Sequence, residues 1–465
     1  MNLNKILFWL LLSLLVWLPL PYGSKPQWAS GILVLLVCAL SAAWLVGFAF
    51  NKVSLTRAFR DARWLHVGFI VFCGWVWFQQ LPLPQEWVAF LSPQAWSIQT
   101  DMYEALGASL PASMTLSVDP FSTQLTGLLT LAYYLLFCLT LLLVNDNHKL
   151  QCFAWAFVVS GTFQAVFGAL STLSGLEILL FSPKETYFGV ATGTYVNRNS
   201  FAGGLEITLA MGMGLLIAQL SDKKAGSWSE WFRTALQTLM SNKVILRTSL
   251  AVMVIGLVLS RSRMGNTAFF SSLMLTGLLY VICRKKLTRG MVILFVSLLL
   301  IDTVIVSQWF GLEQVVNRIE QTSLERETRP NVAEMTIEGI KEYVLTGSGG
   351  GSFYTTLPQY HDGSWRGFYD LAHNDFLQFL LEFGLPAYLI LVFMVLTCGR
   401  HATQALRQRR SKLMIGMAFS AFMGMLAIMI HSSVDFNLQI PANAAYFVCL
   451  MALAVIARYA PHKPV

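Results

Sequence analysis

Long apolar runs, separated by polar or basic stretches, constrain the fold of this sequence more than any other feature. A helical run of about 17–25 apolar residues matches the hydrocarbon thickness of a bilayer. Such runs lie near residues 5–21, 29–50, 64–83, 122–144, 151–172, 201–220, 248–260, 264–283, 290–309, 376–398, 413–434 and 443–458. The run 248–260 is short, and we expect its helix to extend into the flanks. The sequence therefore predicts an all-α polytopic membrane protein, with about twelve transmembrane helices in one transmembrane domain over residues 1–465.

Composition excludes other classes. Charged residues make up 12% of the chain and hydrophobic residues 55%, whereas soluble domains carry about 25% charged residues. The net charge of +8 comes from loops between apolar runs rather than from a basic face with interleaved aromatic residues, so we expect no nucleic acid partner. The seven cysteines lie in or beside apolar runs with no CxxC spacing, which predicts small core residues rather than disulfides or zinc ligands.

Basic residues predict the orientation. If the N-terminus, read as a first transmembrane helix, is cytoplasmic, the loops on that side hold about two-thirds of Lys and Arg, as the positive-inside rule requires. Both termini are then cytoplasmic, and two long loops, 84–121 and 310–375, face the other side. The loop 310–375, between the predicted ninth and tenth helices, is expected to form a helical periplasmic lid over the membrane face.

Two helices are expected within this lid. One helix places Leu312 and Ile319 on one apolar face. The other helix begins at a capping box formed by Asn331 and Glu334 and stops near Gly347. Both helices are too polar to span a bilayer.

The stretch from Gly347 to Tyr388 combines glycines and polar groups more densely than the rest of the chain, and we interpret it as the edge of an active site. His373, Asn374 and Asp375 stand where a membrane helix begins; we expect His373 to be catalytic and Asn374 and Asp375 to bind substrate. Asp370 or Asp375 could hold the His373 imidazole in one tautomer and raise its basicity. A lone histidine is more often structural, so that alternative stays open.

The segment from Tyr195 to Ser200 opens the predicted sixth helix on the same side. Asn199 or Ser200 can cap this helix. Capping does not explain the presence of Arg198, because a cation at a helix N-terminus is unfavourable in the field of the helix macrodipole. We therefore expect Arg198 to bind a ligand together with Asn197 and Asn199, with Glu206 as the counter-ion of Arg198.

Further arginines lie on the side that the positive-inside rule depletes. Arg261 and Arg263 flank the tight turn SRSRMG, where they either reach lipid headgroups or clamp an anion, since guanidinium matches phosphate oxygens. Arg329, in the large loop, is a third candidate, stronger than Arg326 or Arg366. The end of the eleventh helix adds His431, Asp435 and Asn437, for which a capping network is slightly favoured.

Motifs for metal and nucleotide chemistry are absent from the sequence. No Gly-Lys-Ser/Thr follows the glycine run, and neither HExxH nor an Asp-x-Asp pair occurs. We expect neither metal nor cofactor. A site of this kind would neutralise a phosphate leaving group with arginines and backbone dipoles.

Three stretches resemble the O-antigen ligase and polymerase superfamily of bacterial envelope glycosyltransferases. NRNSFAGGLE is similar to its Asn-Arg-Asn segment, and SRSRMG to its Ser-Arg-Gly turn, with Arg263 at the arginine position. The region from RPNVAEMTIEGIKEYVLTGSGGGSF to HNDFLQFLLEFGLPAY resembles its large loop and closing histidine. In the ligase pattern that follows His-Asn, Gly384 fits but Ala387 occupies the last position, so ligase and polymerase both remain open.

The resemblance implies inverting, metal-independent glycosyl transfer at the periplasmic face of the bacterial inner membrane. The donor would be an undecaprenyl-pyrophosphate-linked glycan, and the acceptor a hydroxyl of a glycan or of lipid A-core. The matching arginines, Arg198 and Arg263, would bind the pyrophosphate, helped by Arg329 and Arg261, and His373 would activate the acceptor. A transporter or flippase is the alternative, although it would need polar groups near the bilayer midplane. A non-enzymatic scaffold leaves the outer arginines unexplained.

Overall fold

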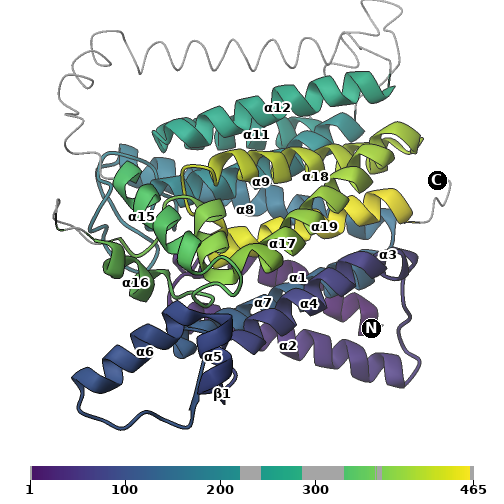
Figure 1. Cartoon of the computed structure of the whole chain (residues 1–465). Helices are drawn as coiled ribbons and strands as arrows, with labels where there is room; N and C mark the ends of the chain where they lie inside the picture. Colours follow the sequence, from purple (N-terminus) through teal and green to yellow (C-terminus); the bar gives the residue numbers. More distant parts are fainter. Residues whose placement is uncertain (1–2, 220–241, 285–328, 362, 364–368, 461–465) are drawn as a thin grey trace, which may run out of the picture.

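A bundle of apolar helices makes up most of the computed structural model, which describes residues 3–219, 242–284, 329–361, 363 and 369–460 (Figure 1). Its long helices are α1 (Leu3–Trp17), α2 (Gln27–Ala49), α4 (Arg63–Gln79), α7 (Pro120–Leu143), α8 (Asn147–Leu173), α9 (Arg198–Ala218), α11 (Asn242–Leu259), α12 (Arg263–Arg284), α17 (Asp375–Gln408), α18 (Lys412–His431) and α19 (Pro441–Tyr459). Short helices are α3 (Arg57–Asp61), η1 (Tyr22–Ser24) and η4 (Asn437–Gln439).

These helices coincide with the predicted apolar segments, except the segment 290–309, which lies outside the described residues. Within the described part of the chain, 8 helices are long and apolar enough to cross a membrane. The shorter apolar helices include α1 and the residues 244–259 of α11. An all-α polytopic membrane protein is therefore confirmed, while the number of twelve spans stays a prediction. The extension expected for the segment 248–260 is found, since α11 begins at Asn242.

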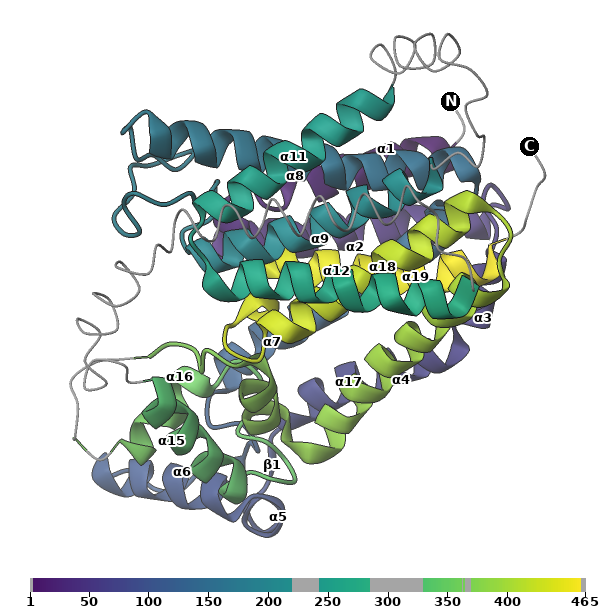
Figure 2. The same cartoon turned by 90° about the horizontal axis from the view of Figure 1, so that it is seen from above.

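Helix α9 lies at the centre of the bundle, with every residue from Ser200 to Ile217 buried. It packs most extensively on α18 (Figure 2). The two backbones touch at Gly214 and Gly416, where a Cβ added to Gly416 would lie 2.2 Å from the Gly214 carbonyl oxygen. Small residues allow such close crossings, which supply packing contacts inside a bilayer where the hydrophobic effect between helices is weak.

Helix α17 contains a break at Gly384, which has φ 74° and ψ 165°. A side chain there would be strained by the positive φ and would also meet the Leu345 carbonyl oxygen at 2.6 Å. The Leu385 amide instead donates to the Val344 carbonyl (2.7 Å). The first segment of α17 thus lies against the loop that precedes it, and the second continues to Gln408.

Two loops that are far apart in the sequence form one small subdomain at an end of the bundle (Figures 1 and 2). The first loop supplies β1 (Leu83–Pro84), α5 (Gln85–Leu91), α6 (Pro93–Ala105) and β2 (Ser113–Met114), and the second supplies α15 (Arg329–Glu342), α16 (Phe353–Thr356) and η3 (Leu357–Tyr360). Their shared core contains Ala95, Val332, Met335, Tyr343, Phe353, Leu357, Ala372 and Leu381. The predicted capping box is wrong, because α15 already begins at Arg329 and Asn331 lies inside it. The helix expected around Leu312–Ile319 lies outside the described residues.

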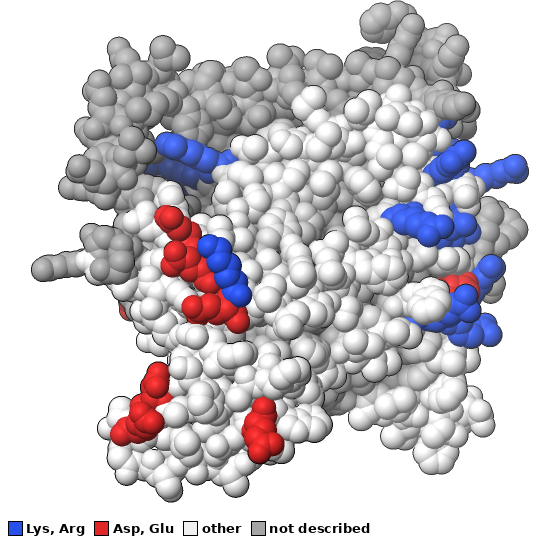
Figure 3. Space-filling model, in the orientation of Figure 1, with Lys and Arg blue, Asp and Glu red and all other residues white. Residues whose placement is uncertain are grey.

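Charge is distributed in keeping with a membrane protein. On the face in Figure 3, acidic side chains gather over α5, α6 and α15, most basic side chains gather at the opposite end, and a broad uncharged band separates them. All seven cysteines are free, and four of them, Cys73, Cys138, Cys398 and Cys449, are buried, in keeping with the small core residues that the sequence predicts.

Candidate functional site

The start of α9 carries three of the predicted site residues. Asn197 caps the helix by accepting a hydrogen bond from the Asn199 amide (2.7 Å). The expectation that Asn199 or Ser200 is the cap is therefore wrong. Arg198 is the first helical residue and is half-buried. Its guanidinium carbon lies 5.8 Å from the centre of the Tyr187 ring, within the range of a cation–π interaction.

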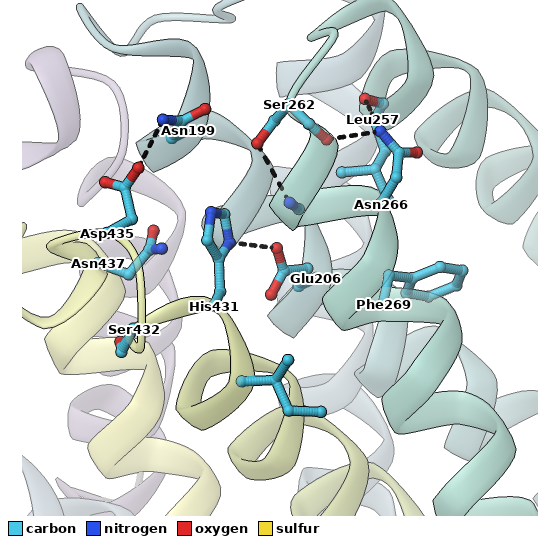
Figure 4. Close-up of polar contacts among 12 residues, drawn as sticks. Asn199, Glu206, Leu257, Ser262, Asn266, Phe269, His431, Ser432, Asp435 and Asn437 are labelled. Carbon is cyan, nitrogen blue, oxygen red and sulfur yellow. Dashed lines mark hydrogen bonds and ion pairs between the residues drawn. The ribbon is translucent and has the colours of Figure 1, made fainter. Parts of the chain in front are cut away.

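Asp435 joins the start of α9 to the start of α17. The Asn199 side chain donates from Nδ2 to Asp435 Oδ2 at 2.5 Å (Figure 4). The Asp375 amide donates to the Asp435 carbonyl at 3.2 Å. Asp435 is 2% exposed and also accepts a hydrogen bond from the Phe436 amide. The neighbours of Arg198 and His373 in the sequence therefore meet at one buried aspartate.

Asn374 and Asp375 fasten the beginning of α17 to the loop after α18. Asn374 caps α17 through the amides of Phe376 and Leu377, and its Nδ2 donates to the Ser433 carbonyl at 2.9 Å. Asp375 is 0% exposed. Its Oδ2 accepts hydrogen bonds from the Ser432 hydroxyl (2.6 Å) and the Leu438 amide (2.9 Å). Both residues thus fix the backbone on which His373 stands.

His373 is half-buried and has a φ of 51°, a conformation that is uncommon for a residue with a side chain and points to a functional constraint. Its ring meets Phe436 and Tyr369 edge-on, with centroid distances of 4.7 and 5.6 Å. Asp370, expected to steer this imidazole, forms an ion pair with Lys25 (3.3 Å). Asp375 is the other expected partner, and its Oδ2 accepts hydrogen bonds from the Ser432 hydroxyl and the Leu438 amide.

The turn between α11 and α12 presents Arg261 and Arg263, both with exposed side chains. Ser262 supports the turn, since its hydroxyl accepts a hydrogen bond from the Gly265 amide (3.2 Å). A Cβ added to Gly265 would lie 2.6 Å from Ala202 Cβ. The turn therefore packs against the first turns of α9, near the helix start that carries Arg198.

Beneath these groups lies a buried ion pair that the sequence did not predict. His431 Nδ1 is 2.6 Å from Glu206 Oε1, and both side chains are 0% exposed (Figure 4). The expected counter-ion role of Glu206 for Arg198 is therefore wrong. No local signal could have identified this pair, because its partners are 225 positions apart in the chain.

The remaining groups at this end serve packing or are only partly described. Asn437 accepts a hydrogen bond from Asn443 Nδ2 (3.2 Å), which fits the capping network expected around it. Arg329 is the first residue of α15, and its side chain lies outside the described residues, as do Arg326 and Arg366. No group of three His, Cys, Asp or Glu in the described ranges could hold a metal ion.

The glycine-rich run 347–352 is a buried junction rather than an open edge of the site. Ser348 and Ser352 are 0% exposed. The Gly350 amide donates to Gln79 Oε1 (3.2 Å) and the Gly351 amide to Glu382 Oε2 (3.0 Å). A Cβ at Gly349 would lie 2.1 Å from Ser117 Oγ. The glycines thus let the loop pass between α4, α7 and α17.

An apolar cavity of about 510 Å³ opens beside the start of α17, between α4, α7, α17 and α19. Aromatic and aliphatic side chains such as Phe69, Phe379 and Phe447 form most of its wall, and Asp375 and Glu382 are among its few polar groups. The cavity therefore extends between these four helices to Asp375, next to Asn374 in the sequence.

Comparison with known proteins identifies one region of the chain. No curated protein matches the sequence. Residues 248–392, about a third of the chain, match the family model described as O-Antigen ligase. This region includes the turn with Arg261 and Arg263, helix α15, the glycine-rich run and the start of α17 with His373. This match confirms the resemblance of residues 248–392 to the O-antigen ligase superfamily.

Proposed function

We propose that the protein transfers a glycan from an undecaprenyl-pyrophosphate carrier to an acceptor hydroxyl at the periplasmic face, with inversion at the anomeric carbon. The family match supports glycosyl transfer of the O-antigen ligase or polymerase type. The undecaprenyl-pyrophosphate carrier, the inversion at the anomeric carbon and the periplasmic location are what we propose beyond this match. One observation carries it: Asp435 brings together the helix starts that bear Arg198 and His373.

In this mechanism the arginines act on the leaving group. Negative charge grows on the diphosphate as the anomeric C–O bond breaks, and fixed guanidinium groups stabilise that charge more in the transition state than in the ground state. Arg198 and Arg263, helped by Arg261 and Arg329, take this role. Arg198 is pre-oriented by its contact with the Tyr187 ring, which reduces the reorganisation needed during the reaction.

His373 acts on the acceptor. Its imidazole accepts the proton of the attacking hydroxyl as the new C–O bond forms. The ring contacts with Phe436 and Tyr369 limit its rotation. Asn374 and Asp375 act mainly as positioning residues, because they hold the beginning of α17 on the loop after α18.

The apolar cavity supports lateral entry of a lipid-linked donor from the bilayer. Its wall consists mainly of apolar side chains of α4, α7, α17 and α19. Asp375, which follows His373 by two positions in the sequence, also lines it. A polyprenyl chain there would leave its diphosphate near the helix ends that carry the arginines.

The variants Arg198→Ala, Arg263→Ala and His373→Ala test this proposal. Purified full-length protein in vesicles would be given a lipid-linked glycan donor and an acceptor, and product formation would be followed at equal protein amounts. Each variant should lower the turnover by a factor of about 100 or more, because one lost charge contact costs roughly 3 kcal/mol of barrier. Arg410→Ala, at the exposed connection between α17 and α18, is the matched control. Near-normal transfer by all three variants would contradict the mechanism.

A further inference from the structure

A second cavity, which is polar and has a volume of about 790 Å³, lies at the opposite end of the bundle, between α3, α4, α17 and α19. Four arginines from these four helices line it: Arg60, Arg63, Arg400 and Arg458. The helices α4 and α17 lie side by side along their length, with α3 beside this end (Figure 2). The cavity is therefore a place where cations from distant parts of the sequence converge.

Positive charge in this cavity is not neutralised by the part of the chain that the structure describes. None of its four arginines has a carboxylate of those residues within ion-pair distance. Asp61, the acidic residue of the wall, is already bound to Arg57 (3.2 Å). Burial, and then the charges of Arg458 and Arg57, lower the pKa of the neighbouring Arg409, as expected where cations crowd together. An anion would relieve this repulsion.

Two buried polar atoms of the wall point to the same conclusion. Within the described residues, Arg458 Nε and His401 Nδ1 have no hydrogen-bond partner. A buried polar atom without a partner costs about 1–3 kcal/mol, so natural structures seldom leave such atoms without a ligand or water. The positive-inside rule explains basic loops at one membrane face, but it does not require guanidinium groups of four helices to line one cavity.

Apolar side chains beside the cavity identify the kind of anion. Trp64 on α4 and Phe393 on α17 line it, and they are 62% and 51% exposed. Leu396, on the turn of α17 that follows Phe393, is 67% exposed. These exposed apolar side chains next to the arginines suit the acyl chains of a lipid, whereas a free inorganic anion would leave them without a role.

We propose that this cavity binds an anionic phospholipid, with its phosphate on Arg400, Arg458, Arg60 and Arg63 and its acyl chains along the outer face of α4 and α17. Guanidinium forks bind phosphate oxygens in pairs, and basic recesses between membrane helices are suited to anionic headgroups. The site is remote from the helix ends that carry His373 and does not depend on glycosyl transfer.

Lipid binding to the full-length protein tests the proposal. The protein, stripped of lipid in a neutral detergent, would be titrated separately with phosphatidylglycerol, phosphatidylcholine and inorganic phosphate. Native mass spectrometry would count the retained lipids, and thermal unfolding would report stabilisation. Phosphatidylglycerol should be retained and raise the unfolding temperature, whereas phosphatidylcholine and phosphate should do neither. Equal stabilisation by inorganic phosphate or by phosphatidylcholine, or no retention of phosphatidylglycerol, would overturn the proposal.

Variants make the test specific. Arg400→Gln with Arg458→Gln should weaken phosphatidylglycerol binding at least about tenfold, because each lost charge-assisted contact contributes about a factor of ten. Lys5→Gln with Lys52→Gln removes the same charge from a separate basic recess and should bind normally; equal weakening there would mean non-specific attraction and overturn the proposal. Trp64→Gln keeps every arginine and should still weaken binding. It covers the case in which the double arginine variant does not fold, and unchanged binding by Trp64→Gln would reject the lipid site.

Discussion

Glu206 and His431 form a contact between two ionisable side chains in the interior of the bundle. Both side chains are fully buried, and in the described residues Glu206 Oε2 and His431 Nε2 have no hydrogen-bond partner. Removing one partner of a buried pair leaves an uncompensated charge, which costs far more than the pair contributes relative to apolar residues. The pair joins α9 to α18 directly beneath Asn199 and Ser262 (Figure 4). It therefore fixes the start of α9 relative to the end of α18.

We expect Glu206→Ala to lower the free energy of unfolding by about 3–5 kcal/mol. The double variant Glu206→Leu with His431→Leu should lose less stability than the sum of the losses in Glu206→Leu and His431→Leu measured singly, because it leaves no lone charge behind. Thermal unfolding of the purified protein in detergent measures both effects. Glu185→Gln, at an exposed glutamate, should change little. Additive losses in the double variant would show that the two side chains are not coupled.

Glu177 gives a prediction that depends on pH. Burial opposes ionisation of its side chain, but hydrogen bonds from Lys184 Nζ (2.7 Å) and the Gly189 amide (2.7 Å), with the charge of Lys184, outweigh burial and lower its pKa. A lowered pKa in the folded state means that the contribution to stability is present above the unfolded pKa of about 4.3 and is lost as the pH falls through the folded value.

Proteolysis of the connection between α8 and α9 should therefore be slow from pH 7 to pH 5 and become faster as the pH falls below the unfolded pKa of about 4.3 and through the lower folded value. Glu177→Gln should be cleaved faster already at pH 7 and show a flatter pH dependence. Glu185→Gln, in the same connection, should keep the profile of the unchanged protein. If the pH profile of Glu177→Gln also matched that of the unchanged protein, a role of the Glu177–Lys184 pair in stabilising this connection would be refuted.

At the scale of elements, the crossing of α9 and α18 positions the site. The helices approach so closely at Gly214 and Gly416 that no side chain fits between them, and the same two helices carry Arg198 and His431 at their other ends. A displacement at the crossing would therefore move the helix ends that form the site. The break of α17 at Gly384 likewise determines where the first segment of α17 lies, and with it the positions of Asn374 and Asp375.

Gly416→Ala should destabilise the protein by about 1–3 kcal/mol, a typical cost of overpacking, although alanine is the better helix former. Its Cβ would meet backbone of α9, which cannot move away as the tip of a side chain can. Gly31→Ala in α2 is the matched control, because nothing lies within 4 Å of the added Cβ, and it should be neutral or stabilising. Comparable unfolding temperatures for the two variants would contradict the packing argument.

At the scale of the whole molecule, an uncharged band separates two differently charged ends (Figure 3). The helix starts with Arg198 and His373 lie at the end that carries the α6, α15 and α16 subdomain, and the cavity lined by Arg400 and Arg458 lies at the other. This arrangement places the proposed chemistry in one compartment and the proposed lipid site in the opposite leaflet.

Cysteine labelling measures that orientation. In a variant without the seven native cysteines, Glu185→Cys should react with a membrane-impermeant maleimide from the periplasm, whereas Arg410→Cys should react only after the membrane is opened. The reason is that each position is exposed at a different end of the bundle. Labelling of both positions from the same side would reject the topology, and labelling in the reverse order would place the site in the cytoplasm.

The sequence by itself determined which segments form membrane helices. In a bilayer each helix must satisfy its own backbone hydrogen bonds, so the signal is local to the segment. The boundaries of α2, α7 and α19 accordingly lie within a few residues of the predicted runs. Local composition also indicated the polar helix ends at Asn197–Asn199 and His373–Asp375, because polar groups at the edge of apolar runs need a reason.

Only the tertiary structure decided which of these groups meet. Glu206 contacts His431 rather than Arg198, Asp435 joins Asn199 to Asp375, and α6 shares a core with α15. The physical reason is that such contacts depend on the relative placement of helices whose own formation requires no partner. The glycine-rich run likewise indicated the edge of an active site, while its conformation is set by Gln79 and Glu382, which the chain brings to it from two other helices.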